Sequence, residues 1–413
     1  MLALSGCDSP AAPADAGAPD APRVDSGVDA GPPPDDSPYK GPLTLHPTTT
    51  SIHVRWESRL APAEVALEVT PEAGGSATTY TGTTRETQVQ LEYGVGSPLV
   101  SEPDVPGTYY VNDVDITALQ PATCYRYSVV GWPSEGGRFC TMHEPTDHTT
   151  PIRFYAIGDT SPGVMGTVRI LEANDPATTE FTVHVGDIQY YSAIVESQQL
   201  WFRLMEPLLR ANAFLPCLGN HESERDHELE DIYLRLFGGA GEGTDLWYTY
   251  ETGGVHFFSL STEDDLAVGS EQYEWFVAEL DRAEASEGYR FSVVYFHRPY
   301  YSVGDYRPRL DLRESMEPVI TSHRVPLVLA GHMHGYERFE IGDVRYITTG
   351  AGGFTIMDID QLVMDYPEDA ARRVAAFSHL QAMYFEIVGD EIHGEAVDDL
   401  GMVRDEFTFV AAP

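Results

Sequence analysis

Basic residues are scarce in this chain of 413 residues, which has 25 lysines and arginines against 65 aspartates and glutamates. The formal net charge is therefore −40 at neutral pH. So acidic a surface repels polyanions, and no basic stripe offsets it, which argues against nucleic acid as a partner. The acidic surface is expected to promote solubility in an extracellular or salty medium. A phosphate ligand would still need local positive charge, which bound metal cations would supply.

Long apolar runs are also missing, and no stretch is long and apolar enough to span a membrane. Cys7 lies in Leu4-Ser5-Gly6-Cys7, which resembles the lipobox at which bacterial lipoproteins are cleaved and acylated. Only six residues precede this cysteine, so the charged and apolar signal segment is absent, and a chance match is the alternative. We expect a secreted or cell-envelope lipoprotein that meets the membrane only through a lipid at Cys7.

Cysteines number four. Cys124 and Cys140 lie on two predicted strands, 124–131 and 137–142, around a turn expected near 133–136. They would face each other if the pairing were centred near Trp132, so the sequence allows either a cross-strand disulfide or two separate buried thiols. A disulfide would fit an oxidising compartment. Cys217 lies in an apolar run and is expected to be a buried structural thiol.

Composition divides the chain into four parts. Residues 1–7 read as the remnant of a lipoprotein signal, and residues 8–40, rich in Ala, Pro and Asp, as a disordered tether. Short alternating runs such as 51–56, 65–69 and 109–111 predict a small β-sandwich over 41–146. Within it, Leu119-Gln120-Pro121-Ala122-Thr123-Cys124-Tyr125 resembles the L-x-P-x-T-x-Y corner of fibronectin type III modules, with Tyr125 as the corner tyrosine.

Residues 150–413 show a different hydrophobic pattern from the β-sandwich segment. Apolar strands alternate with amphipathic stretches, of which 192–209 and 270–285 are the clearest helices, so we predict a layered α/β domain. In such sheets the residues just past the strand ends line the ligand crevice. The predicted strands are 152–157, 181–185, 255–260, 291–296 and 326–330.

Five strand ends carry residue types that bind metals. Each lies in a tight turn, and glycine opens four of them, which lets the backbone turn sharply and leaves the side chain pointing into the crevice. Singly each motif is weak, since Gly-Asp is a common turn and an isolated histidine is more often structural. Together they supply oxygen and imidazole donors that suit Fe, Mn or Zn. The motifs are Gly158-Asp159, Gly186-Asp187-Ile188-Gln189-Tyr190, Gly219-Asn220-His221-Glu222, Phe296-His297-Arg298 and Gly331-His332-Met333-His334.

The order GD, GDxxY, GNHE, H and GHxH resembles the signature of the calcineurin-like metallophosphoesterases, and within them of the purple acid phosphatases. Tyr190, three residues after Asp187, distinguishes the purple acid phosphatase pattern, because most other members of the superfamily lack this tyrosine. The segment 331–338 also resembles that family's form of the last motif. The resemblance spans about 150–410 and implies a layered α/β/β/α domain. The preceding β-sandwich matches the architecture of the family's larger members.

The resemblance implies two metal ions that share Asp187. One would be held by Asp159, Asp187, Tyr190 and His334, and the other by Asp187, Asn220, His297 and His332. The phenolate implies Fe(III) at the first site and divalent Fe, Zn or Mn at the second. Hydrolysis would use a metal-activated hydroxide. Asn220 and His221 would contact the phosphate, and His221 would protonate the leaving alkoxide or, alternatively, only brace its turn.

Two segments depart from the family's pattern. Thr160 and Ser161 replace the usual Leu-Gly, and their hydroxyls either approach the first metal or only close the turn. Plant-type members carry extra histidines after the lone metal histidine, whereas the loop 298–307 has none. Arg298, Tyr301 and Arg307 are candidates to hold the phosphate or the leaving group, or else pack the loop.

The predicted function is hydrolysis of small phosphate esters, with phosphomonoesters preferred. A phosphodiesterase or nucleotide hydrolase on the same centre is one alternative, because metal ligands do not set substrate size. A catalytically idle surface-binding lipoprotein is another. The complete ligand set argues against idleness, because a vestigial site should have lost at least one ligand type.

Overall fold

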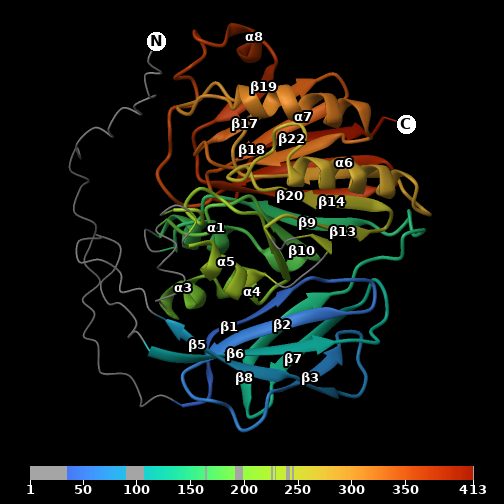
Figure 1. Ribbon diagram of the computed structural model, residues 1–413, viewed down its shortest axis with the longest axis vertical. Coiled ribbons are helices and arrows are strands. Elements are labelled where there is room, and N and C mark those ends of the chain that lie inside the picture. The colour runs from blue at the N-terminus through green and yellow to red at the C-terminus, as the bar shows by residue number, and fades with distance from the viewer. Residues whose placement is uncertain are drawn as a thin grey trace, which may run out of the picture. The chain divides into compact units, whose positions relative to one another are not determined.

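The computed structural model describes residues 35–89, 107–162, 165–190, 199–224, 227, 229–238, 242–243 and 246–412 (Figure 1). The predicted signal remnant and the tether up to residue 34 lie outside the described residues. No helix of these described segments combines the length and the apolar character needed to cross a bilayer.

Two four-stranded antiparallel sheets form a β-sandwich, drawn in blue to blue-green in Figure 1. Their inner faces meet through side chains such as Trp56, Leu67 and Phe139, all buried. The order is β1-β2-β6-β5 in one sheet and β4-β3-β7-β8 in the other. The strands are β1 Pro38–Leu45, β2 Ile52–Ser58, β3 Ala66–Pro71, β4 Thr78–Thr81, β5 Thr83–Val89, β6 Gly107–Ile116, β7 Cys124–Val129 and β8 Trp132–Cys140.

The first strand begins three residues before the predicted start of the sandwich at 41. The reason is Lys40, which is 1% exposed although it follows a proline-rich segment. Its Nζ lies 3.1 Å from Glu57 Oε2 and 4.7 Å from the ring centroid of Tyr109. An ion pair and an aromatic face thus hold in the sheet a residue that the predicted boundary at 40 had assigned to the tether.

The tyrosine corner is present, since the Gln120 N–H donates to the Tyr125 hydroxyl oxygen at 2.9 Å. The turn expected near 133–136 is wrong: it lies at 130–131, where Gly131 has φ +87°. A bulge then shifts the register, so that Val129 pairs with Trp132 but Ser128 pairs with Gly136. Beyond the bulge Cys124 faces Cys140, and the two form a disulfide. Cys217 is free and buried, as predicted.

Removing this disulfide should lower the stability of the sandwich. Its cysteines are 16 residues apart, and closing a loop of that size is worth about 3 kcal/mol in the unfolded-state entropy model. We expect the double variant Cys124→Ala/Cys140→Ala to unfold at a clearly lower urea concentration than the native chain. Reductant provides the control, because it should lower the midpoint of the native chain and leave that of the variant unchanged.

The rest of the chain forms two mixed sheets. The six-stranded sheet has the order β11-β10-β9-β20-β21-β22, and the eight-stranded sheet has the order β12-β13-β14-β15-β16-β18-β17-β19. The predicted strand 152–157 matches β9 to the residue, and the other four match within one residue at either end. The strands are β9 Ile152–Ile157, β10 Phe181–His184, β11 Ala213–Pro216, β12 Glu242–Gly243, β13 Tyr248–Thr252, β14 Val255–Ser259, β15 Phe291–Tyr295, β16 Leu327–Ala330, β17 Tyr336–Ile341, β18 Val344–Thr349, β19 Arg373–Phe377, β20 Gln381–Val388, β21 Glu391–Asp398 and β22 Val403–Val410.

Three hydrophobic clusters give the α/β/β/α layering. The first lies between the two sheets and joins Phe154 and Phe385 of one to Phe257 of the other. The second packs helices on the six-stranded sheet, and the third packs helices on the eight-stranded sheet (Figure 1). The helices are α1 Gly166–Ala173, α3 Gln199–Leu204, α4 Glu206–Leu209 and α5 Glu230–Phe237 on the first side, α6 Glu271–Glu284 and α7 Leu310–Ser322 on the second, and the short η2 Pro176–Thr178 and α8 Pro367–Ala370.

The two predicted helices fare differently. The stretch 270–285 is α6, with Ser270 as N-cap: its hydroxyl accepts from the Tyr273 N–H. The stretch 192–209 is not one helix, because α3 ends at Leu204 and α4 begins at Glu206. Pro207 lacks the N–H that a continuous helix would bond to Arg203, so the chain restarts the helix one residue before it. Residues 192–198 lie outside the described residues.

Candidate metal centre

The five predicted motifs follow five strands of the two sheets. Asp159, Asp187 and Asn220 come after β9, β10 and β11, which run parallel in one sheet. His297 and His332 come after β15 and β16, which run parallel in the other. Hydrogen bonds join neighbouring loops, from the Asp159 N–H to Gly186 O at 3.0 Å and from the Gly331 N–H to His297 O at 2.9 Å. The carboxyl ends of both sheets thus deliver their side chains to one place.

Glycine opens four of the motifs mainly because a side chain there would clash with a neighbouring loop, rather than because the backbone turns sharply. Only Gly186 has a positive φ, of +83°. A Cβ at Gly158, Gly219 or Gly331 would lie 2.2–2.5 Å from an atom of another loop, namely Val185 Cγ2, Asp187 N or Asp159 Oδ2. The expectation that all four glycines serve a sharp turn is therefore wrong for three of them. Their lack of a side chain allows the loops to pack against one another.

The left-handed backbone lies instead on three of the predicted metal ligands. Asp159, Asp187 and His332 have φ values of 56°, 49° and 67°. Residues with a Cβ rarely adopt this region, and such strain of about 1–3 kcal/mol persists only where the surroundings impose it. Here it aims three buried side chains at one centre. Backbone strain gathered on the ligand residues is typical of a functional site.

One group of donors consists of Asp159, Tyr190 and His334. The Tyr190 hydroxyl lies 3.2 Å from Asp159 Oδ1, and His334 Nε2 lies 3.3 Å from the same oxygen. Tyr190 and His334 are also in direct contact through hydroxyl and Nε2. His334 Nδ1 faces Thr355 O at 2.8 Å, which directs Nε2 toward the carboxylate. Three different donor atoms therefore converge on one point.

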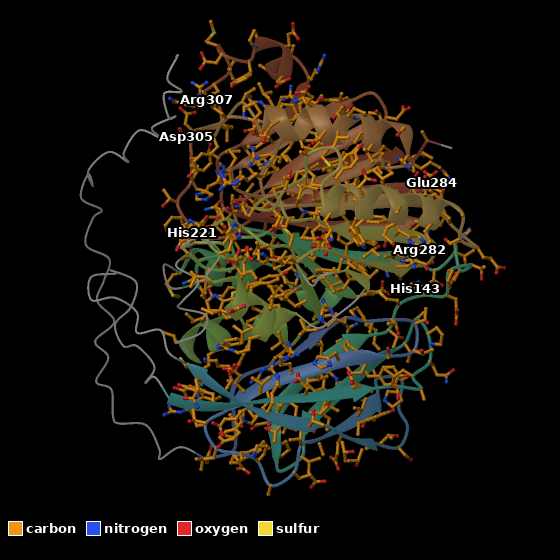
Figure 2. All side chains as sticks on the ribbon, viewed as in Figure 1. His143, His221, Arg282, Glu284, Asp305 and Arg307 are labelled. Carbon is orange, nitrogen blue, oxygen red and sulfur yellow. A yellow bond between two sulfur atoms is a disulfide. The ribbon has the colours of Figure 1, made fainter. Side chains whose placement is uncertain are left out.

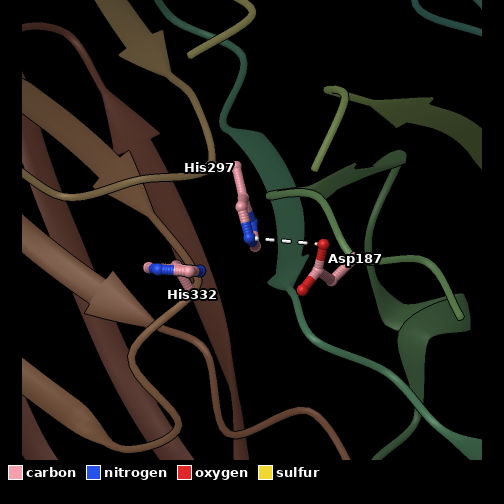
Figure 3. Close-up of side chains that lie close together, drawn as sticks. All are labelled: Asp187, His297 and His332. Carbon is pink, nitrogen blue, oxygen red and sulfur yellow. Dashed lines mark ion pairs between the residues drawn. The ribbon is translucent and has the colours of Figure 1, made fainter. Parts of the chain in front are cut away.

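A second group consists of Asp187, Asn220, His297 and His332. His297 Nε2 lies 3.0 Å from Asn220 Oδ1 and 3.3 Å from Asp187 Oδ1, and Figure 3 shows His297 between Asp187 and His332. The nearest ligand atoms of Asp187, His297 and His332 all lie within 4.8 Å of one another. His297 Nδ1 faces Val185 O at 2.9 Å, so that Nε2 points into the centre.

These distances suit metal ions. Two ligands bound about 2.1 Å from one ion stand about 3.0–3.4 Å apart at usual coordination angles, as the donor pairs here do. His332 Nδ1 is buried and has no hydrogen-bond partner among the described residues, which leaves it available as a ligand. The residues therefore fit two ions, one in each group. The groups are linked, since the His332 N–H donates to Asp159 Oδ2 at 2.9 Å and the Thr160 N–H to Asp187 O at 3.0 Å.

Electrostatics favour a cation at the same place. Burial opposes the charged imidazolium of His297, but the carboxylates of Asp187 and Asp159 outweigh burial and raise its pKa to about 10. Burial likewise opposes the charge of Asp187, yet His297 and His221 hold the pKa of that carboxyl well below its usual range. A potential that binds a proton this firmly also attracts a metal ion, which would replace the proton on Nε2.

Glu222 holds the second and third motifs together. Its Oε2 accepts from the N–H groups of Asp187 and Gly219, both at 2.9 Å, and its Oε1 accepts from the Ile188 N–H at 3.0 Å. The residue is 3% exposed. Glu222 thus orients the neighbouring backbone through these three hydrogen bonds.

His221 stands at the edge of the centre. Its backbone N–H donates to Asp187 Oδ1 at 3.0 Å, and its Nδ1 contacts Glu224 Oε1. Its side chain is 23% exposed, on the side of the domain where Figure 2 also labels Asp305 and Arg307. The backbone braces the turn while the imidazole is accessible, so both predicted roles are compatible with the geometry.

The loop after β15 brings one of its three candidates to the centre. Arg298 Nη1 lies 3.2 Å from His332 Nε2, and Glu263 holds the rest of the guanidinium at 2.7 and 3.0 Å. Tyr301 is 5% exposed and packs against Phe339 and Tyr346, away from the ligand side chains. Its prediction as a substrate-binding residue is corrected, since the apolar cluster on α7 buries it. Arg307 is exposed and forms no hydrogen bond or ion pair within the described chain.

The hydroxyl of Thr160 closes the turn rather than facing the donors, since it donates to Ile188 O at 2.5 Å. The Ser161 N–H donates to Thr167 Oγ1 at 2.7 Å, and the Ser161 hydroxyl is buried without a partner among the described residues. The departure from the family's Leu-Gly therefore changes how the first loop is braced.

Three residues around the donors are absent from the sequence-based prediction. Glu263 lies past the end of β14, where a search for carboxylates at strand ends would have found it. Phe354 stacks on Tyr190 with ring centroids 3.7 Å apart, and Tyr306 stacks on His332 with centroids 4.1 Å apart. No pattern in the sequence marks these two aromatic residues.

Comparisons with known proteins identify related phosphoesterases. Residues 152–336 match the model of the calcineurin-like phosphoesterase family. "Probable purple acid phosphatase 20" of Arabidopsis thaliana is 29% identical over 300 residues, which cover 66% of this chain and 67% of the relative. Purple acid phosphatase 23 of the same plant is 27% identical, with 63% and 66% covered. The chain thus aligns with about two thirds of these relatives' length, and one further relative carries the name "Probable inactive purple acid phosphatase 9".

Among solved structures, purple acid phosphatase PPD1 from yellow lupin (Lupinus luteus) has a similar fold. Its TM-score is 0.73 at 18% identity, and the match covers 91% of this chain and 74% of the lupin chain. The structure titled PhoD matches with a TM-score of 0.62 at 12% identity and covers 92% of both chains. The sandwich followed by two stacked sheets, the motif order and these relatives agree: residues 152–336 form a domain of the calcineurin-like phosphoesterase family, and the chain is similar to purple acid phosphatases with an N-terminal β-sandwich domain.

Proposed function

We propose that the protein hydrolyses small phosphate esters, with phosphomonoesters as its preferred substrates, at a centre of two metal ions. The observation that carries the proposal is the convergence of two linked donor groups, Asp159–Tyr190–His334 and Asp187–Asn220–His297–His332, at the carboxyl ends of two sheets. Asp187 would belong to both ions. Tyr190 favours Fe(III) in the first group, and the second group suits divalent Fe, Zn or Mn.

When bound, two such ions lower the pKa of water and offset the negative charge that develops on a transferred phosphoryl group. The remaining tasks fall to the chain. Arg298, fixed by two hydrogen bonds to Glu263, presents Nη1 beside His332 and would bind a phosphate oxygen there. Asn220 would contact the phosphate as well. His221 would hydrogen-bond the phosphate or deliver a proton to the leaving alkoxide, with Glu224 orienting its ring.

A position outside the cytoplasm is part of the proposal. The disulfide Cys124–Cys140 supports an oxidising compartment, and the net charge of −40 suits an extracellular medium. Acylation of Cys7 would make the protein a cell-envelope lipoprotein. Mass spectrometry of the mature N-terminus tests this, because an uncleaved, unmodified chain would contradict it.

Turnover of 4-nitrophenyl phosphate and of bis(4-nitrophenyl) phosphate by the metal-loaded protein tests the function. We expect chelator-sensitive hydrolysis that returns on adding metal, with a higher kcat/KM for the monoester. A higher kcat/KM for the diester would favour the phosphodiesterase alternative. No turnover of either compound by protein that carries two ions would favour the catalytically idle, surface-binding alternative.

A further inference from the structure

The loop after β15 ends in a short exposed tip that is fixed on its N-terminal side. Ser302 Oγ donates to Glu337 Oε2 at 2.7 Å, and the Val303 N–H donates to Glu337 Oε1 at 3.1 Å. Glu337 is itself fully buried and paired with Arg373 at 3.0 Å. The Leu362 N–H also donates to Val303 O at 2.9 Å. The tip that follows, residues 305–307, is therefore held in place although it is exposed.

Tyr306 directs its ring from this tip over the metal centre. The ring lies parallel to the His332 imidazole within 17°, with centroids 4.1 Å apart, and meets His334 edge-on at 6.4 Å. One face thus covers a residue from each donor group. The side chain is still 39% exposed, and it is the only aromatic residue among the exposed large hydrophobic side chains of the described chain. His332 stacks on one face of the ring, and the opposite face has no aromatic partner among the described residues.

We propose that Tyr306 is a specificity-determining residue that selects phosphate esters with a flat aromatic leaving group. The inference rests on the proposed function, because it needs a phosphoryl group at the adjacent donors. A phosphate held near His332 and Arg298 would place its ester oxygen beside the open face of the Tyr306 ring. A planar alcohol on that oxygen would then stack, whereas a puckered aliphatic group of similar size would not.

The geometry favours stacking over a hydrogen-bonding role. A ring held flat on His332 presents its other face as a rigid surface, and ordering that surface costs no further side-chain entropy on binding. Stacked aromatic pairs are worth about 2- to 10-fold in affinity beyond the area they bury. The substrate class is aryl phosphates and similar esters of flat alcohols.

Two phosphonates that cannot be hydrolysed test the proposal by calorimetry. Phenylphosphonate and cyclohexylphosphonate share the anionic group and differ in the planarity of the ring. We expect the metal-loaded protein to bind the phenyl compound about 3- to 10-fold more tightly. Tyr306→Phe should keep this ratio, and Tyr306→Leu should reduce it to about one while leaving the affinity for inorganic phosphate unchanged. Leu310→Ala, an exposed change three residues from Arg307, serves as the control.

Each other outcome overturns the proposal. Equal binding of the two phosphonates by the native protein removes the selectivity, and an unchanged ratio in Tyr306→Leu assigns it to another residue. Loss of phosphate affinity in Tyr306→Leu would mean that the ring supports the donors rather than the leaving group. Failure of the proposed function is separate, since it would appear as absent turnover of every ester, while the two binding constants could still be compared.

Discussion

Asparagine in place of Asp187 is expected to abolish hydrolysis of phosphate esters and to reduce the bound metal from two ions to one or fewer. Asn keeps the shape of the side chain, so the Oδ1 that accepts from the His221 N–H at 3.0 Å remains. It removes the negative charge that lies 3.3 Å from His297 Nε2 and that both donor groups are proposed to share. Loss of a group that only supports a ligand costs about 10- to 100-fold, so loss of a shared ligand should exceed that.

Metal analysis beside the rate separates this explanation from simple misfolding. The variant should keep its circular dichroism spectrum and cooperative unfolding, while its metal content and kcat/KM both fall. Asp231→Asn is the matched control, because it removes the same charge from an exposed position on α5 and should change neither quantity. A variant that retains two ions and ordinary turnover would show that Asp187 is not shared.

The centre could be predicted because each of its ligands sits at the end of a strand that has its own local signal. Buried strands such as 152–157 and 291–295 are mostly apolar, with Arg153 and Ser292 as the exceptions, and the polar residues that follow them are expected at the edge of the sheet. Parallel pairing of β9, β10 and β11 then brings together Asp159 and Asn220, which are 61 positions apart in the sequence. The strand pattern thus indicates where the ligand-bearing loops lie, and the resemblance to the metallophosphoesterases implies which of their residues share an ion.

The loop side chains could not be predicted in this way. Tyr301 and Tyr306 are five residues apart in a segment without periodicity, and the sequence does not indicate which of them faces the centre. Their positions depend on Glu337, which lies on β17 and fixes the loop at Ser302 and Val303. Tyr301 is consequently directed into the cluster with Tyr346, and Tyr306 toward His332. A contact between segments that are distant in the sequence therefore determines which of the two tyrosines faces the centre.

The disulfide illustrates the same difficulty within one hairpin. Its formation depends on a bulge between Ser128 and Val129, which shifts the register by three residues. The turn at 130–131 followed by this bulge gives the register centred on Trp132 that the pairing of Cys124 with Cys140 requires. A turn near 133–136 would not give this register by itself. The sequence therefore allowed the bridge to be considered while its turn was predicted wrongly.

Glutamine in place of Glu222 is expected to weaken metal binding by about 10- to 100-fold without directly altering the reacting groups. The two carboxylate oxygens accept three backbone N–H groups, from Asp187, Ile188 and Gly219. Glutamine keeps one accepting oxygen and turns an NH₂ group toward at least one of these donors. Leaving a buried N–H unpaired costs about 1–3 kcal/mol, so the loops that carry Asp187 and Asn220 should move apart.

Activity measured against metal concentration distinguishes this positioning role from a chemical one. If Glu222 only holds the loops, excess metal should restore most of kcat in Glu222→Gln, whereas a group that takes part in the reaction would leave kcat low at any metal concentration. Glu180→Gln is a suitable control. That carboxylate also accepts a backbone N–H, from Arg153 at 3.1 Å, but it lies before β10, at the end of the strand opposite Asp187. The Glu180→Gln protein should be less stable but should bind metal with unchanged affinity. The edge of the sheet at which Glu180 lies carries none of the proposed ligands.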